Sequence, residues 1–154
     1  MIPPGVYSFS EYFFNGRSDT SRRLSGNARV GAGPYYTGYK HSYSMGAAFR
    51  ANYRFNTSVS YTHNNISLSQ VSEGRFKTHL FAGRVNVGFS TTKFLNALVQ
   101  YSSDTRQWTS NIRFNLIHRP LSDFFLVYNE RRNSLDGGLA DRALIAKITY
   151  MISR

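Results

Sequence analysis

Side chains that could perform acid–base chemistry are few in this sequence, and they are widely spaced. Hydrolysis by paired carboxylates needs two acidic groups that converge on one bond. Apart from Glu11 and Glu130, the acidic residues fall at expected turns or strand ends, where ordinary turn chemistry explains them; they are Asp19, Glu73, Asp104, Asp123, Asp136 and Asp141. The sequence therefore predicts no catalytic carboxylate pair, and it has no nucleophile elbow for a catalytic serine.

The histidines are the remaining candidates for catalysis or metal binding, and they are His41, His63, His79 and His118. His63 and His79 fall in consecutive expected strands and could approach each other. No third ligand accompanies them at a useful spacing, and the absence of cysteine excludes thiolate sites. We therefore expect no metal, no cofactor and no catalytic residue, and we predict that the chain is not an enzyme.

The charge is strongly positive, with 19 basic and 8 acidic residues and a formal net charge of +11. Such an excess indicates a negatively charged partner, usually nucleic acid or anionic lipid. A β-protein that binds nucleic acid needs aromatic rings and arginines on the same exposed face. Here they alternate onto opposite faces, so the sequence predicts no nucleic-acid partner and favours lipid.

The stretch "MGAAFRANYRFN", from Met45 to Asn56, shows this alternation, because its apolar side chains occupy the odd positions and its arginines the even ones. Side chains of a strand point to opposite faces in turn, so such a strand separates two environments. Similar segments recur along the chain, separated by turn residues. They are Tyr7–Asn15, Leu24–Gly33, Tyr39–Phe55, Ser58–Leu68, Phe76–Ser90, Phe94–Ser103, Gln107–His118, Asp123–Arg131 and Arg142–Ile152.

Short connections such as "RFNT", "STTK" and "SDTR" predict hairpins, and therefore an antiparallel up-and-down meander. The segment "LADRALIAKI" contains good helix formers. Its alternation from Leu144 to Ile152 favours a strand instead. No linker-like stretch divides the chain, so we expect 1–154 to be one all-β domain.

Segment length bears on whether the apolar side faces a protein core or lipid. Strands of soluble sheets commonly have about 5 to 6 residues, whereas a tilted transmembrane strand has about 9 to 11. Several segments reach the greater length, and aromatic residues gather near segment ends, as at a lipid–water boundary; they are Tyr53, Phe55, Phe89, Phe94, Tyr101, Tyr128 and Tyr150. No apolar run is long enough for a membrane-spanning helix, and the start "MIPPGVYSFSEYFF" is not a secretory signal.

A membrane barrel would direct its polar side chains into a wet lumen and its apolar ones toward lipid. The expected lumen-facing residues are Arg29, Arg50, Arg84, Arg113 and Lys147. The expected lipid-facing residues are Phe49, Phe81, Val87, Val99, Ile112 and Ile148.

Several stretches, taken in order, resemble one bacterial family. They are "IPPGVYSF", "YTHNNISL", "FKTHLFAGRVNVGFS", the run from Phe94 to Arg131 that contains "LVQYSSDT", "NIRFN" and "RPLSDFFLVYNER", and the end "RALIAKITYM". Together they cover nearly all of the chain. They are similar to the C-terminal part of large bacterial outer-membrane proteins that carry an N-terminal carbohydrate-binding-like β-sandwich domain and a β-barrel of uncharacterised function.

The resemblance implies that the chain forms the last strands of a larger barrel, with the N-terminal domain and the early strands absent. It implies the bacterial outer membrane as location. The partners would be membrane lipid, the missing parts of the same protein and the barrel-assembly machinery. One departure is the end "TYMISR", which places Tyr150 four residues before Arg154, whereas strands of this class typically end in an aromatic residue.

We therefore expect an antiparallel meander of eight or nine long strands that forms an outer-membrane-type β-barrel, or the C-terminal part of a larger one. Its expected role is that of a porin-like passage or of a membrane anchor for the missing domain. One alternative is a soluble β-barrel that binds a small apolar ligand in its interior. Another is a hydrolase embedded in a barrel, which would need acids or histidines to converge at one rim.

Overall fold

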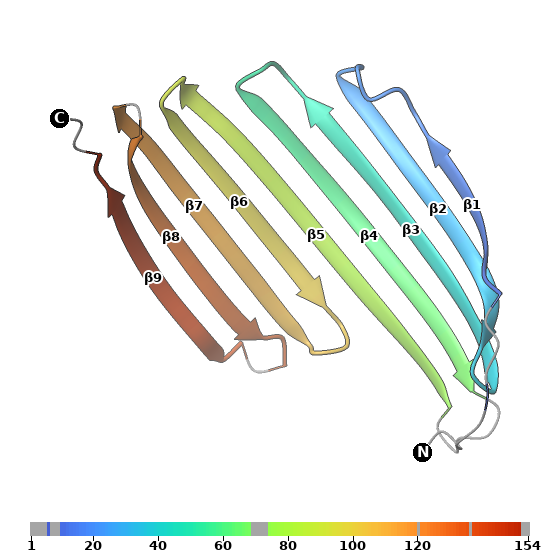
Figure 1. The fold of residues 1–154 in the computed structure, drawn as a ribbon. Coiled ribbons are helices and arrows are strands. Elements are labelled where there is room, and N and C mark those ends of the chain that lie inside the picture. Colours follow the sequence, from blue (N-terminus) through green and yellow to red (C-terminus); the bar gives the residue numbers. More distant parts are fainter. Residues whose placement is uncertain (1–5, 7–9, 69–73, 120, 136, 152–154) are drawn as a thin grey trace.

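The chain forms one antiparallel sheet of nine strands in sequential order, from β1 at one edge to β9 at the other (Figure 1). The computed structural model describes residues 6, 10–68, 74–119, 121–135 and 137–151. The strands are β1 Tyr12–Arg17, β2 Leu24–Tyr35, β3 Gly38–Arg50, β4 Phe55–Leu68, β5 Arg75–Ser90, β6 Lys93–Ser102, β7 Gln107–Arg119, β8 Ser122–Asn133 and β9 Leu139–Thr149. No helix occurs in these described ranges, so the predicted all-β meander is confirmed.

The turn between β3 and β4 corrects one prediction, because the segment Tyr39–Phe55 is not a single strand. β3 ends at Arg50, and the side chain of Asn52 closes the turn by accepting hydrogen bonds from the backbone N–H groups of Arg54, at 2.8 Å, and Phe55, at 2.9 Å. Asparagine favours such turns because its short amide mimics a backbone carbonyl. The apolar–polar alternation continues through the turn in phase, so periodicity alone did not reveal it.

Apart from the start of β1, the other strand boundaries lie within three residues of the predicted ones. The largest shift is in β9, Leu139–Thr149, and Ile152 of the predicted segment Arg142–Ile152 lies outside the described residues. The predicted segments Phe76–Ser90 and Gln107–His118 correspond to β5 and β7, each with one added residue. Part of the predicted segment Tyr7–Asn15 lies outside the described residues, and β1 begins at Tyr12. The segment "LADRALIAKI" is a strand, because Leu144 of β9 pairs with Tyr128 of β8.

The sheet is open, since its strand order starts at β1 and ends at β9. Every neighbouring pair is antiparallel, so β1 and β9 run in the same direction and form the two outer edges in Figure 1. The expected closure into a barrel is therefore not present in this sheet.

The sheet has no hydrophobic core of its own. Among the described residues, Ile66 is the one buried hydrophobic side chain, at 8% exposure. No second layer of secondary structure covers either face in Figure 1. Within the same residues, no helix has the length and apolar character needed to cross a membrane.

Close packing of backbone at Gly38 yields a first prediction. An added Cβ there would lie 1.7 Å from the carbonyl oxygen of Ser67 on β4, whereas a Cβ on Gly83 would meet only Phe81 Cε1, at 4.0 Å. We expect Gly38→Ala to lower the free energy of unfolding by about 2 kcal/mol, because β3 must move away from β4. Gly83→Ala is the control, with an expected change within about 0.5 kcal/mol.

Thermal unfolding of both variants, followed by circular dichroism, measures the difference. Equal melting temperatures for Gly38→Ala and the wild-type chain would show that β3 and β4 do not approach this closely.

Candidate functional site

The strand registers divide the side chains into two chemically different faces. One row across seven strands contains Phe49, Thr57, Val85, Ala97, Ile112, Tyr128 and Leu144. The adjacent row lies on the other face of the sheet. From β3 to β7 it contains Arg50, Asn56, Asn86, Asn96 and Arg113. We call the face of Phe49 the apolar face and the face of Arg50 the polar face.

The registers place each predicted residue on one of these faces. Arg29, Arg50, Arg84, Arg113 and Lys147 all belong to the polar face. Phe49, Phe81, Val87, Val99, Ile112 and Ile148 all belong to the apolar face. The two sets come from six strands, so alternation within each strand is preserved across most of the sheet.

Apolar side chains of the apolar face are exposed. The exposed fractions are 43% for Phe49, 39% for Ile112 and 75% for Ile148. In β3 the usual pattern is inverted, since Met45 and Phe49 are exposed while Ser42 and Ser44 of the polar face are half-buried. An exposed apolar surface of this extent marks a site that contacts protein, ligand or lipid.

Amide and hydroxyl side chains join neighbouring strands on the polar face. Asn86 Nδ2 donates to Asn56 Oδ1 at 2.6 Å, and Asn111 donates in the same way to Asn129. Further along the strands, Asn64 donates to Thr78 at 3.2 Å. The side chains of this face are therefore held in place by one another.

Three arginines stand among these amides without a carboxylate. Arg50, Arg84 and Arg113 are exposed, and none is ion-paired within the described part of the chain. Arg50 and Arg84 line one hollow of about 240 Å³, together with Arg22, Ser25, Asn56, Ser58 and Asn86. Arg84 and Arg113 line the adjoining hollow with Asn86, Asn96 and Asn111. Guanidinium and amide N–H groups are all donors, so this surface suits anions and polar solutes rich in acceptors.

Sequence reasoning missed part of this surface. Asn56 and Asn96 were not selected, because only the register brings them beside Arg50, Arg84 and Arg113, and Arg22 was not selected because it reaches the hollow from the turn between β1 and β2. The sequence signal was a polar residue at every second position. That alternation shows which face of a strand a side chain occupies, but it does not show which residues of the adjacent strands lie beside it.

Two aromatic residues lie where they were not expected. Phe94 pairs with Asn115 and Gly88 and therefore belongs to the polar face. Tyr128 lies in the middle of β8, opposite Ile112 and Leu144, and is not at a strand end. By contrast, Tyr101 and Trp108 are neighbours near the ends of β6 and β7, with ring centroids 4.9 Å apart.

Within the described part of the chain, the acidic side chains do not converge. Lys40 pairs with Glu11 at 3.5 Å, and Arg131 pairs with Asp141 at 3.5 Å. In the turn after β1, the backbone N–H of Ser21 donates to Asp19 at 2.9 Å and lowers the pKa of that carboxyl. These contacts are turn chemistry and exposed ion pairs rather than a hydrolytic pair.

Glu130 is the centre of a compact ionic cluster on the apolar face. Arg142 donates to its carboxylate from Nε at 3.1 Å and from Nη2 at 3.0 Å, and Tyr128 and Arg132 donate to it as well. The Glu130 side chain is 14% exposed. Its acceptors are therefore occupied by structural partners.

His63 and His79 are direct cross-strand neighbours, as predicted, with ring centroids 4.5 Å apart. The hydroxyl of Tyr61 lies 2.7 Å from His79 Nδ1. Among the described side chains, no group of three or more His, Cys, Asp or Glu is placed to hold a metal ion.

Comparisons with known proteins add no identification. No family model matches this chain, and no curated protein or solved structure matches it.

The Glu130 cluster yields a second prediction. Glu130→Gln leaves Arg132 and Arg142 without their carboxylate, and we expect it to lower the free energy of unfolding more than the control variant does. The control is Asp141→Asn, which breaks the more exposed ion pair with Arg131 and should change the free energy of unfolding by at most about 1 kcal/mol.

Chemical unfolding curves of the two variants provide the comparison. A Glu130→Gln protein that is no less stable than Asp141→Asn would show that the cluster does not hold β8 and β9 together.

Proposed function

We propose that this sheet is part of the wall of an outer-membrane-type β-barrel. The apolar face would contact lipid, and the polar face would line a wet lumen. The observation that carries the proposal is the exposed apolar face of a sheet that buries a single hydrophobic side chain among its described residues.

The free energy of burying apolar side chains supports a lipid partner for the apolar face. Fully burying one large apolar side chain stabilises a protein by about 1.5–3 kcal/mol. Phe49, Phe81, Val99, Ile112 and Ile148 are each more than a third exposed. Because only the exposed fractions remain to be covered, covering them would contribute on the order of 4–7 kcal/mol, which is comparable with the lower end of the net stability of a whole domain.

Strand length fits a membrane. β5 has 16 residues, β4 has 14 and β3 has 13, and a tilted strand needs about 9–11 to cross the hydrocarbon layer. A closed barrel also pairs every backbone group of its strands, which lipid requires.

Strand parity supports a larger barrel. The nine strands make β1 and β9 parallel, so the sheet can close antiparallel only if an odd number of strands joins it. Single-chain bacterial barrels have even strand numbers. In our proposal the additional strands belong to the same protein, which the barrel-assembly machinery would insert into the bacterial outer membrane.

The proposed role is a passage for polar or anionic solutes, or an anchor for a further domain of the same protein, without catalysis. Arg50, Arg84 and Arg113 would give the lumen its positive potential, because no carboxylate of the described residues neutralises them. In a soluble barrel with an apolar ligand, the same arginines would lie on the outer surface.

Consecutive positions on β6 test which face meets lipid. Val99 belongs to the apolar face and Gln100 to the polar face. We expect Val99→Arg to lower folding stability in phosphatidylcholine bilayers by about 2–4 kcal/mol, whereas Gln100→Arg is tolerated. The folded fraction is measured by protection from protease. The reverse order of the two variants, or a monodisperse monomer in the absence of detergent, would contradict the proposal.

Ion selectivity tests the lumen separately. In planar bilayers the complete barrel should conduct anions in preference to cations. Replacing Arg50, Arg84 and Arg113 together by Gln should shift the reversal potential toward cation permeation. Arg131→Gln is the control, since Arg131 already pairs with Asp141. Cation preference in the wild-type barrel would refute a cationic lumen.

A further inference from the structure

The apolar face changes its chemistry at one end of β3, β4 and β5. Two consecutive rows cross these three strands there, and each ends in a cation on β5. The first row contains Tyr39, Ser67 and Arg75, and the second contains His41, Asn65 and Lys77. We call these six residues the cationic patch.

The cationic patch surrounds one hollow of about 410 Å³, and these six residues are its lining. Arg75, Lys77 and His41 are exposed, and no carboxylate of the described residues forms an ion pair with either cation. Asn65 Oδ1 is buried and accepts no hydrogen bond there. The hollow therefore offers two positive charges, which suits a phosphate group.

A second hollow lies on the same face of the same strands. It has a volume of about 270 Å³ and is lined mainly by apolar side chains, namely Met45, Ala47, Val59, Tyr61 and Phe81, with Gly46 and Ser60. Lys77 and Phe81 are four residues apart on β5, or about 13 Å at the rise of a strand. Between the two hollows lies the row of Tyr43, His63 and His79.

We propose that the two hollows together bind one anionic, phosphate-bearing membrane lipid. Arg75 and Lys77 bind its phosphate, and an acyl chain follows β5 past His79 into the hollow beside Phe81. A free anion would use the cationic patch alone, whereas the apolar hollow on the same strands requires an amphiphile. This inference rests on the proposed contact between the apolar face and lipid.

Lipid retention tests the inference. The protein is folded into phosphatidylcholine bilayers that contain a minority of phosphatidic acid, and lipids that remain bound after transfer to detergent are counted by native mass spectrometry. We expect phosphatidic acid to be enriched about tenfold or more over phosphatidylcholine, because each basic residue near a membrane surface contributes strongly to anionic lipid binding. The double variant Arg75→Gln/Lys77→Gln should lose the enrichment.

Matched variants separate the site from net charge. Lys93→Gln/Arg119→Gln removes the same charge from strand ends away from the patch and should retain the enrichment. Ser67→Glu keeps both cations but places a negative charge in the hollow, so it should abolish retention. Equal retention by all four proteins, or displacement of phosphatidic acid by inorganic phosphate at equal concentration, would overturn the proposal.

The single tryptophan distinguishes failure of this inference from failure of the proposed function. Trp108 is exposed on the apolar face, in the row of Phe81 and Tyr101. Brominated phosphatidylcholine should quench its fluorescence if that face meets lipid. Quenching without phosphatidic acid enrichment refutes the lipid site alone, whereas an absence of quenching refutes the membrane contact on which it rests.

Discussion

The antiparallel register, which is continuous through the middle of every strand, is the constraint on which the other features of this structure depend. From β2 to β9 the pairing shifts at three places, all near strand ends, between Gly88 and Ser90, Ile117 and Arg119, and Arg131 and Arg132. Because side chains alternate with a period of two, a slip of one residue in the middle of any strand would exchange its two faces. The register therefore keeps the two faces chemically distinct across the sheet.

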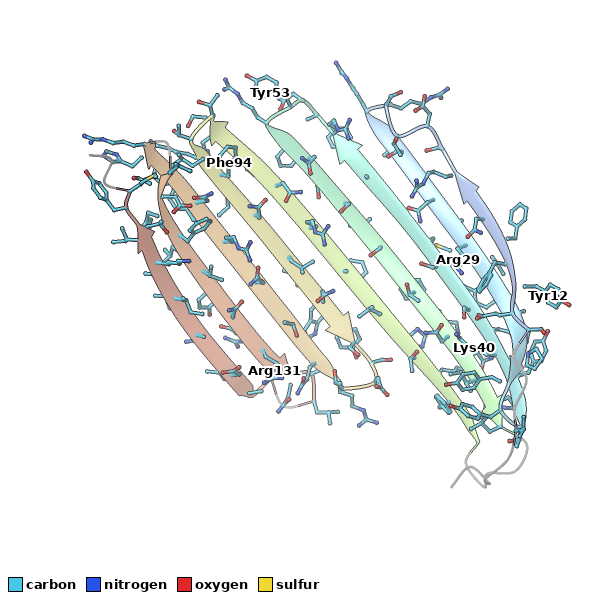
Figure 2. All side chains as sticks on the ribbon, viewed as in Figure 1. Tyr12, Arg29, Lys40, Tyr53, Phe94 and Arg131 are labelled. Carbon is cyan, nitrogen blue, oxygen red and sulfur yellow. The ribbon has the colours of Figure 1, made fainter. Side chains whose placement is uncertain are left out.

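A two-faced sheet without a core must obtain its stability from what covers it. Backbone hydrogen bonds hold the strands together, and amide pairs such as Asn86 and Asn56 strengthen the polar face. On the apolar face such bonds join Arg142 to Glu130 and Tyr61 to His79. Figure 2 shows side chains standing along the sheet with no packed layer above them. Lipid would supply that layer without a second sheet or helices. On the same face, charged groups occur as the Glu130 cluster and the cationic patch.

Sequence reasoning predicted the strands because alternation and turn residues are local properties. It identified β9 as a strand despite its helix-forming residues, and it placed Arg50 and Phe49 on opposite faces. It missed the turn at Asn52, since the alternation continues in phase through that turn. It also could not pair Lys77 with Asn65, or Asn96 with Arg113, because such neighbours are set by register between strands. The sheet is open between β1 and β9, and alternation within a strand does not report whether a sheet closes.

The central claim is that the apolar face contacts lipid while the polar face contacts water. The chain contains no cysteine, so single cysteines introduced from Leu95 to Tyr101 on β6 can each carry a nitroxide label. In bilayers, lipid-soluble oxygen should reach the labels at odd positions, and a water-soluble nickel chelate should reach those at even positions. Alternation in that phase along β6 is the predicted result. Labels with the opposite phase, or with equal access to both reagents at every position, would contradict the account.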